Sequence, residues 1–162
     1  MGRIDKINYY LDIAETVLER GTCLRRNFGA IIVNNDEIVS TGYVGAPRGR
    51  ANCVDLGYCT REKLNIPKGQ RYELCRSVHA EQNAIISASR ADMIGATIYL
   101  ACHDAKTNEL YGDVEPCSMC KRAFIIVCIE KVIVRTLITE YKIFNVIDWV
   151  ENDDSINGSE GY

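Results

Sequence analysis

Runs of β-branched residues alternate with segments of helical periodicity along most of this chain, and no other feature constrains its fold as strongly. The predicted strands cover residues 28–33, 37–41, 97–101 and 130–135. The predicted helices, in which apolar residues recur every three or four positions, cover residues 4–18, 78–91 and 118–127. The first two strands flank Asn34-Asn35-Asp36, which is typical of a β-hairpin turn. Because the later strands are separated by helices, the order predicts an α/β protein with a sheet between helices.

Length and composition predict one compact domain followed by a short tail. The chain has 162 residues, of which 47% are hydrophobic and 25% are charged, a balance that excludes a disordered polyelectrolyte. We expect residues 1–150 to form the domain and residues 151–162, in the acidic and polar stretch after Trp149, to form a frayed tail. Residues 42–74 are rich in Gly, Pro, Arg and Cys, and they predict a long loop with a short helix near 60–64.

The charge balance indicates the kind of partner. There are 19 Lys and Arg residues against 22 Asp and Glu, a formal net charge of −3, so no overall basic field attracts nucleic acid or a membrane. A small substrate is expected instead. No apolar run approaches the ~20 residues that a membrane span needs, and the acidic N-terminal segment does not resemble a signal peptide.

The expected compartment decides the chemical form of the cysteines. We expect a cytoplasmic protein, in which the eight cysteines serve as thiolate ligands or buried thiols rather than as disulfides. Cys102 lies at the end of a predicted strand and Cys128 at the end of a predicted helix, both next to apolar residues. We predict that both are core thiols.

Two short motifs carry the residues that point to chemistry. His79-Ala80-Glu81 opens one predicted helix and Pro116-Cys117-Ser118-Met119-Cys120 opens the next. Cys117 and Cys120 are three positions apart, so both sulfurs can face one point in the first helical turn, where the helix N-terminus favours the thiolate. One imidazole and two thiolates match the ligand count of a catalytic zinc site, which keeps a fourth position for water. We therefore predict that His79, Cys117 and Cys120 bind zinc.

Glu81 is the predicted catalytic group beside this site. It lies two residues from His79, so it can take a proton from the zinc-bound water and deliver it to a ring nitrogen and to a departing amine. The order H-x-E and then P-C-x-x-C is the signature of zinc-dependent nucleobase deaminases. Each motif alone has another explanation, because C-x-x-C also occurs in redox and other zinc sites and an isolated His is usually a surface or core residue. Their combination favours the deaminase.

With these motifs the sequence resembles the deoxycytidylate (dCMP) deaminase family of the cytidine deaminase superfamily. The resemblance extends over about residues 23–135 and includes the segments 27–33 (NFGAIIV) and 42–49 (GYVGAPRG) besides the two zinc motifs. It implies a three-layer cytidine-deaminase-like fold with a mixed five-stranded sheet flanked by helices. It also implies a homo-oligomer, commonly a hexamer.

The resemblance also assigns residues to the substrate. Arg90, eleven residues after His79 on the same predicted helix, matches a family arginine that meets the nucleotide phosphate; without the resemblance it is a solvated residue at a helix end. Tyr43 and Val44 lie in the segment that matches the substrate loop, and Tyr141 matches a tyrosine that contacts phosphate or sugar. The family usually has Asn in place of Val44. The preferred nucleotide is therefore left open, because polar groups decide discrimination more strongly than apolar walls.

Four further cysteines, Cys23, Cys53, Cys59 and Cys75, lie around the long loop. Some family members hold a second, structural zinc in this region, and the resemblance implies these four as its ligands, with Cys59 matched least closely. Four thiolates complete a closed tetrahedral site, which would fasten a loop that has little core of its own. The alternative is four independent thiols.

Together these features predict an enzyme that uses one catalytic zinc to convert dCMP to dUMP and ammonia. Two alternatives stay open. One is a deaminase of another free nucleotide or nucleobase-containing metabolite. The other is a non-catalytic protein in which zinc stabilises a nucleotide-binding fold, and this alternative predicts metal and ligand binding without release of ammonia.

Overall fold

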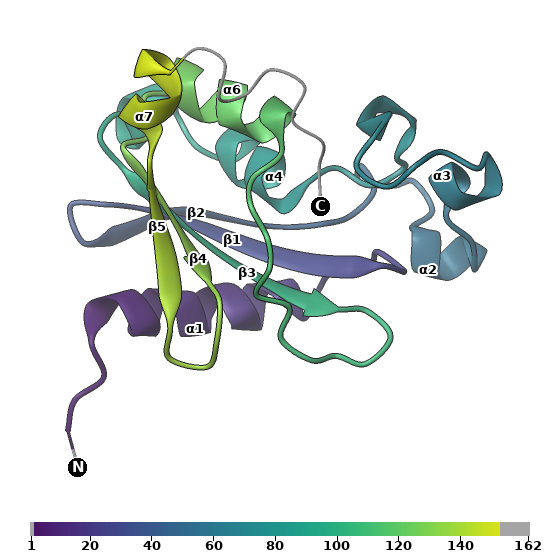
Figure 1. The fold of residues 1–162 in the computed structure, drawn as a ribbon, viewed down its shortest axis with the longest axis horizontal. Helices are drawn as coiled ribbons and strands as arrows, with labels where there is room; N and C mark the ends of the chain where they lie inside the picture. Colours follow the sequence, from purple (N-terminus) through teal and green to yellow (C-terminus); the bar gives the residue numbers. More distant parts are fainter. Residues whose placement is uncertain (1, 153–162) are drawn as a thin grey trace.

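The computed structural model describes residues 2–152 of the chain (Figure 1). The strands are β1 (Arg26–Asn34), β2 (Glu37–Tyr43), β3 (Thr97–Asp104), β4 (Lys131–Arg135) and β5 (Tyr141–Asn145). The helices are α1 (Lys6–Leu18), α2 (Cys53–Leu56), α3 (Thr60–Lys63), α4 (Ala80–Ile86), α5 (Arg90–Met93), α6 (Ser118–Ile126) and α7 (Val146–Glu151), with a 3-10 turn, η1, at Tyr72–Leu74.

The five strands form one mixed sheet in the order β2-β1-β3-β4-β5. β1 pairs antiparallel with β2 and β3, and β4 pairs antiparallel with β5, whereas β3 and β4 are parallel. A parallel pair needs a crossover connection, and α6 lies in the one that joins β3 to β4. Figure 1 shows α1 on one face of the sheet and α4, α6 and α7 on the other. The predicted three-layer α/β fold with a mixed five-stranded sheet is therefore confirmed.

β1 supplies side chains to two cores, one on each face of the sheet. Phe28, Ala30 and Ile32 belong to the core beneath α4 and α6. Ile31 and Val33 belong to the core beneath α1. Because successive side chains of a strand point to opposite faces and both faces are covered, the strand sequence is a nearly continuous apolar run.

Helix α1 is held by its cap, by a close approach to β1 and by a buried arginine. Asp5 accepts a hydrogen bond from the Asn8 backbone N–H at 2.9 Å, which satisfies one of the free donors of the first turn. A Cβ at Gly29 would lie 2.1 Å from the Ala14 carbonyl oxygen, so only glycine lets the helix approach this closely. Arg135 of β4 is 2% exposed and donates to both the backbone and the side-chain oxygen of Asn8.

The helix predicted over residues 78–91 is two helices in the structure. α4 ends at Ile86, and α5 begins at Arg90 with Ser89 as its N-cap. The Ser89 side chain accepts a hydrogen bond from the Asp92 backbone N–H, so this serine starts a helix rather than continuing one. The prediction that Arg90 shares a helix with His79 is therefore wrong.

The C-terminal part of the described chain was predicted incompletely. Neither β5 nor α7 was predicted, because β5 is an exposed edge strand and α7 is a single short amphipathic segment. Trp149 is 6% exposed and its ring stacks on Phe124, so the chain is still part of the core at that position. Most of the predicted tail, residues 153–162, lies outside the described residues.

The segment 42–74 contains α2, α3 and η1, and the helix predicted near residues 60–64 is α3.

Cys102 is fully buried, as predicted. Cys128 is exposed, so its prediction as a core thiol is wrong; it lies beyond the end of α6 with a positive φ of 61°. No helix within residues 2–152 is long and apolar enough to cross a membrane.

Candidate metal centre and the adjoining pocket

The starts of two helices bring the predicted zinc ligands together. His79 is the N-cap residue of α4 and Cys117 is the N-cap residue of α6, while Cys120 lies in the first turn of α6. Both helices cover the same face of the sheet (Figure 1). The backbone at both cap residues is extended, so the chain enters each helix from a loop and can direct these side chains toward one point.

The distances between the three ligand atoms fit a zinc ion. His79 Nδ1 lies 3.6 Å from Cys117 Sγ and 3.6 Å from Cys120 Sγ. Tetrahedral coordination with ordinary zinc–sulfur and zinc–nitrogen bond lengths places such atoms about 3.5 Å apart. Among the described residues, these three form the group of His, Cys, Asp and Glu whose ligand atoms all lie within 4.8 Å of one another. All three are buried.

The ionisation of the three groups also suits a dication. A hydrogen bond from Cys120 holds the pKa of the Cys117 thiol well below its usual range, and the same interaction together with burial raises the pKa of Cys120. Burial lowers the pKa of His79, but its hydrogen bond with Cys117 and the negative charges of Glu81 and Cys117 together outweigh burial, so the net shift is upward. The chain alone therefore holds one thiolate here, and a bound zinc ion would favour ionisation of the second thiol.

Glu81 lies beside these ligands, with the Cys120 thiol as its neighbour. Its side chain is fully buried, and neither carboxylate oxygen has a hydrogen-bond partner among the described residues. Burial raises the pKa of Glu81 to about 7. A buried carboxyl without a partner is costly unless it is protonated or meets a ligand, so this group can exchange a proton near neutral pH.

Helix α4 is fixed against β2, which positions His79 and Glu81. A Cβ at Gly42 would lie 2.3 Å from the Ala80 carbonyl oxygen, so the strand and the helix touch at this glycine. Ser40 of β2 donates to a carbonyl of α4 at 2.7 Å, and Asn83 of α4 donates to the backbone of Tyr43 at 2.8 Å. The start of α4, with His79 as its N-cap, is thus tied to the sheet.

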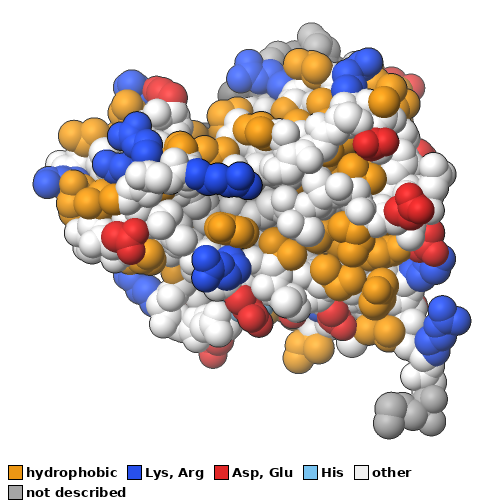
Figure 2. Space-filling view, turned by 180° about the vertical axis from the view of Figure 1, so that it is seen from behind, with side chains coloured by type: hydrophobic (Ala, Val, Ile, Leu, Met, Phe, Trp, Pro, Cys, Tyr) orange, Lys and Arg blue, Asp and Glu red, His pale blue; other side chains and the backbone are white. Residues whose placement is uncertain are grey.

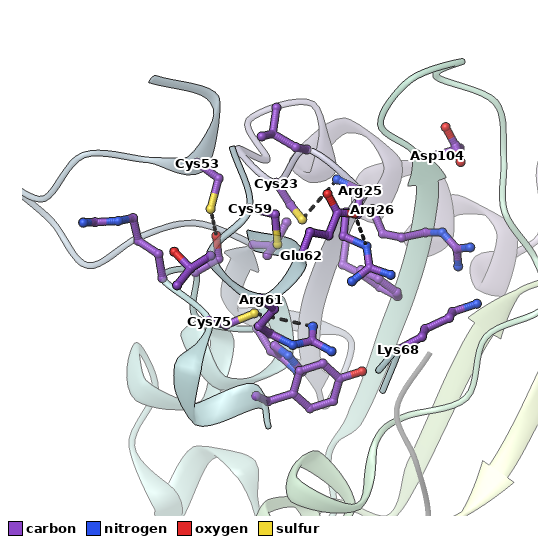
Figure 3. Close-up of a pocket in the computed structure, with 18 of the residues that line it drawn as sticks. Cys23, Arg25, Arg26, Cys53, Cys59, Arg61, Glu62, Lys68, Cys75 and Asp104 are labelled. Carbon is purple, nitrogen blue, oxygen red and sulfur yellow. Dashed lines mark hydrogen bonds and ion pairs between the residues drawn. The ribbon is translucent and has the colours of Figure 1, made fainter. Parts of the chain in front are cut away.

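A pocket of about 310 Å³ reaches from the surface to His79 (Figure 3). Its basic lining residues are Arg25, Arg26, Arg61, Lys68, Arg76 and Lys106, and its acidic ones are Glu62 and Asp104. Figure 2 shows Lys and Arg side chains over the end of the molecule that carries α2 and α3. The pocket therefore attracts anions although the whole chain is acidic.

This basic lining was not predicted from the sequence. The available signal was the density of Arg and Lys in the loop regions on either side of β1 and β2, but the net charge of the chain conceals it. Arg26 is the most informative of these residues. Its Nη1 is buried without a hydrogen-bond partner among the described residues, and its guanidinium stacks on Tyr111 at 3.4 Å from the ring centroid.

The predicted substrate contacts fall into two groups. Val44 lines the pocket and is buried. Tyr43 is exposed, and it is not among the residues that line the pocket. Arg90 donates to the Ile126 carbonyl and contacts Cys128 outside the pocket. Tyr141 pairs with Arg135 across β4 and β5 and so lies on the face of the sheet that carries α1, opposite the metal ligands. Within one chain the structure brings only Val44 of these four to the pocket.

The four cysteines of the predicted second zinc site all line the same pocket (Figure 3). No three of their sulfurs lie within 4.8 Å of one another in the described chain. Cys75 Sγ instead accepts a contact from Arg61 at 3.7 Å, and Cys53 Sγ lies 3.7 Å from Ser77 Oγ. Burial raises the pKa of both of these thiols.

Comparison with known proteins gives one matching family model. The model of the cytidine and deoxycytidylate deaminase zinc-binding region matches residues 4–136. A deoxycytidylate deaminase of Mycobacterium phage D29 is 34% identical over 138 residues, which cover 82% of this chain and 96% of that protein. A deoxycytidylate deaminase of Schizosaccharomyces pombe is 30% identical over 129 residues, but the match covers only 36% of its length.

Solved structures give the same fold. The dCMP deaminase of cyanophage S-TIM5 superposes with a TM-score of 0.55 at 24% identity, covering 83% of this chain and 85% of that one. Cytidine deaminase from Burkholderia pseudomallei superposes with a TM-score of 0.58 at 18% identity, covering 90% and 95%. At these identities the similarity concerns the fold alone.

Proposed function

The chain belongs to the family defined by the cytidine and deoxycytidylate deaminase zinc-binding region, and from this premise we propose that it is a zinc-dependent hydrolase that converts dCMP to dUMP and ammonia. One observation carries the proposal. His79, Cys117 and Cys120 converge at zinc-binding distances beside Glu81, a buried carboxyl that lacks a hydrogen-bond partner in the described chain.

The proposed mechanism assigns the proton transfers to Glu81. When bound, zinc supplies a water whose pKa is lowered to about 7, so that it can attack carbon 4 of cytosine. The Glu81 carboxylate accepts a proton from that water and delivers it to the ring nitrogen. It then takes the second proton, from the hydroxyl now bonded to carbon 4, and gives it to the amine, so that the carbon–nitrogen bond breaks, ammonia leaves and a carbonyl remains. Burial, which raises the pKa of Glu81 to about 7, suits a group that both accepts and donates a proton at neutral pH.

The basic pocket supports a phosphorylated substrate over a free nucleoside. A nucleotide monophosphate brings an anion, and guanidinium groups form paired hydrogen bonds with phosphate oxygens. Arg26 offers a buried donor that no residue of the described chain satisfies. We therefore propose that Arg26 contacts the phosphate, with Val44 on the wall of the same pocket.

Release of ammonia tests the reaction. We expect release from dCMP and little from CMP, dCTP, deoxycytidine or purine nucleotides. The Glu81→Gln variant should lose at least about 10²-fold in rate while its zinc content stays unchanged. Zinc and nucleotide binding without ammonia release from any compound would refute the enzyme and favour a binding protein.

Steady-state kinetics with and without the phosphate tests the anion subsite. Arg26→Gln should raise KM for dCMP about 10-fold or more, because it removes a charge-assisted contact. Arg50→Gln is the matched control, since Arg50 is exposed and does not line the pocket. A loss of the same size with deoxycytidine would contradict a phosphate contact.

We also propose a second, structural zinc bound by Cys23, Cys53, Cys59 and Cys75. Their common position around one pocket supports it, although the sulfurs must move closer together to share one ion. Metal analysis of the purified protein tests the proposal. About two zinc ions per chain, reduced to one by Cys53→Ser, is the expected result, and one per chain in the wild type would refute it.

Finally, we propose a homo-oligomer, with a hexamer as the family expectation, in the cytoplasm. Support comes from exposed apolar side chains on the helical face, notably Ile86 and Ile126, which are 75% and 69% exposed. Contacts of Arg90, Tyr43 and Tyr141 with substrate would then require a neighbouring copy. Sedimentation velocity tests the assembly, and a monomer at micromolar concentration would contradict it. Cell fractionation tests the location.

A further inference from the structure

Arg61 of α3 is a buried cation with an unusual set of contacts. Its side chain is 4% exposed, and no carboxylate lies within ion-pair distance of it among the described residues. It donates to the carbonyl oxygens of Gln70 at 2.9 Å and Pro67 at 3.4 Å, and it contacts Cys75 Sγ at 3.7 Å (Figure 3). Burying a charge without an ion partner is expensive, so these contacts hold the guanidinium in one place.

The Tyr72 ring lies between the guanidinium of Arg61 and the imidazole of His79. Its central carbon lies 4.5 Å from the ring centroid of Tyr72, a cation–π distance. The Tyr72 ring in turn meets the His79 ring edge-on, with centroids 4.6 Å apart and planes at 76°. Arg61, Tyr72 and His79 thus form a continuous series of contacts from α3 to the metal ligand.

This series of contacts bears on metal binding, because Nδ1 of His79 must face the sulfurs of Cys117 and Cys120 at the same time. The imidazole is at an N-cap position, ahead of α4, so the helix backbone alone does not fix the rotation of its ring. The Tyr72 ring occupies one side of the imidazole and restricts that rotation. Residues that orient a metal-binding histidine contribute to metal affinity without touching the ion.

We propose that Tyr72 and Arg61 are positioning residues that hold the His79 ring in its metal-binding orientation. They link the cysteine-lined loop to the metal centre, because Arg61 also contacts Cys75. The inference rests on the proposed function only for the identity of the metal. Its tests use metal binding and ring contacts, so they can succeed or fail independently of any release of ammonia.

Cobalt binding to the full-length protein tests the proposal. Cobalt(II) is titrated against a competing chelator, and the part of the visible absorption that His79→Ala removes reports the metal centre rather than the cysteine loop. Tyr72→Leu and Arg61→Gln should weaken affinity at this centre about 10–100-fold and shift its absorption bands. Tyr72→Phe should stay within about 2-fold of wild type, because the ring rather than the hydroxyl meets His79.

Lys63→Gln is the matched control, since Lys63 lies on the same short helix but is exposed. Its cobalt affinity should equal that of the wild type. The proposal is overturned if folded Tyr72→Leu binds cobalt within about 2-fold of wild type, or if Tyr72→Phe loses as much as Tyr72→Leu.

A measurement on the wild-type protein tests the proposal even if the variants fail to fold. Nuclear Overhauser effects between the ring protons of Tyr72 and His79 are expected, because the ring centroids are 4.6 Å apart. Their absence from a well-resolved spectrum would overturn the proposal directly.

Discussion

Val44 forms an apolar part of the pocket wall, at a position where the resemblance to the family leads us to expect an asparagine. Its backbone is fixed on both sides, since its N–H donates to Phe28 at 3.2 Å and its carbonyl accepts from Thr22 at 3.0 Å. Its side chain lines the pocket but has no hydrogen-bonding group. The Val44 side chain can therefore act on a bound molecule through its shape but not through a hydrogen bond.

Replacing Val44 by Asn tests how much a hydrogen-bonding side chain at this position would contribute to substrate binding. Val44→Asn should lower KM for dCMP about 10-fold, the equivalent of one hydrogen bond, because it places an amide on the wall of the proposed substrate pocket. Steady-state kinetics with dCMP and CMP measures the change. Val44→Ala is the control for altered volume, and equal effects of the two variants would show that hydrogen bonding is not involved.

A second prediction at this scale concerns Tyr10 and Asp36 and gives a pH dependence. Tyr10 donates to Asp36 Oδ1 at 2.5 Å, and Lys6 and Tyr10 together hold the pKa of Asp36 below its ordinary value of 3.8. This stabilisation is present above pH 3.8 and is lost as pH falls through the lowered pKa of the folded state.

Tyr10→Phe should therefore lower the melting temperature at pH 7, and the difference from wild type should shrink below pH 3.8. Thermal unfolding at a series of pH values measures it, with Tyr9→Phe as the control because Tyr9 is exposed. A difference that stays constant down to pH 3 would contradict the proposed role of the Asp36 carboxylate.

At the level of elements, the approach of β2 to α4 decides where the predicted metal ligand His79 lies. The glycine at position 42 leaves room for the helix backbone, since a Cβ there would lie 2.3 Å from Ala80 O and 2.4 Å from Ala84 N. Backbone atoms cannot rotate away as a flexible side chain can. Any added atom must therefore displace the helix that begins directly after His79.

Gly42→Ala should destabilise the protein by about 1–3 kcal/mol and weaken zinc binding. Both effects have the same cause, the shift of α4 away from β2. Denaturant unfolding and competition with a zinc chelator measure them. Gly2→Ala should change neither, because nothing lies within 4 Å of a Cβ at that position. Reduced stability with unchanged zinc affinity would show that α4 does not position His79.

For the whole molecule, the metal is expected to contribute to stability as well as to chemistry. The three ligands come from two helices that are separated along the chain, so binding an ion there links α4 to α6. A ligand that binds only the folded state stabilises it by about 2.7 kcal/mol when present at 100 times its Kd.

Removal of zinc with a chelator should therefore lower the melting temperature by about 5–10 °C, and added zinc should restore it. Differential scanning calorimetry measures the shift. His79→Ala is the control, because any response that survives in it reports the cysteine loop rather than the metal centre. An unchanged melting temperature in the wild type would contradict zinc binding at the three ligands.

The sequence by itself determined the layered sheet apart from β5, the helix starts at His79 and Cys117, and the group of candidate metal ligands. These features depend on local periodicity and on residue types with few alternative uses, so neighbouring residues carry enough information. The break between α4 and α5 was not predicted from the sequence. Ser89 caps α5 within a segment whose apolar spacing continues that of α4, and composition alone does not reveal such a cap.

Only the tertiary structure decided which basic residues share a pocket, which face Tyr141 occupies, and that Arg61 reaches His79 through Tyr72. Each of these depends on contacts between segments that are far apart or irregular in the sequence. The physical reason is that a pocket is formed by loops whose path is set by packing and by buried charge, and no local pattern of residues specifies that path.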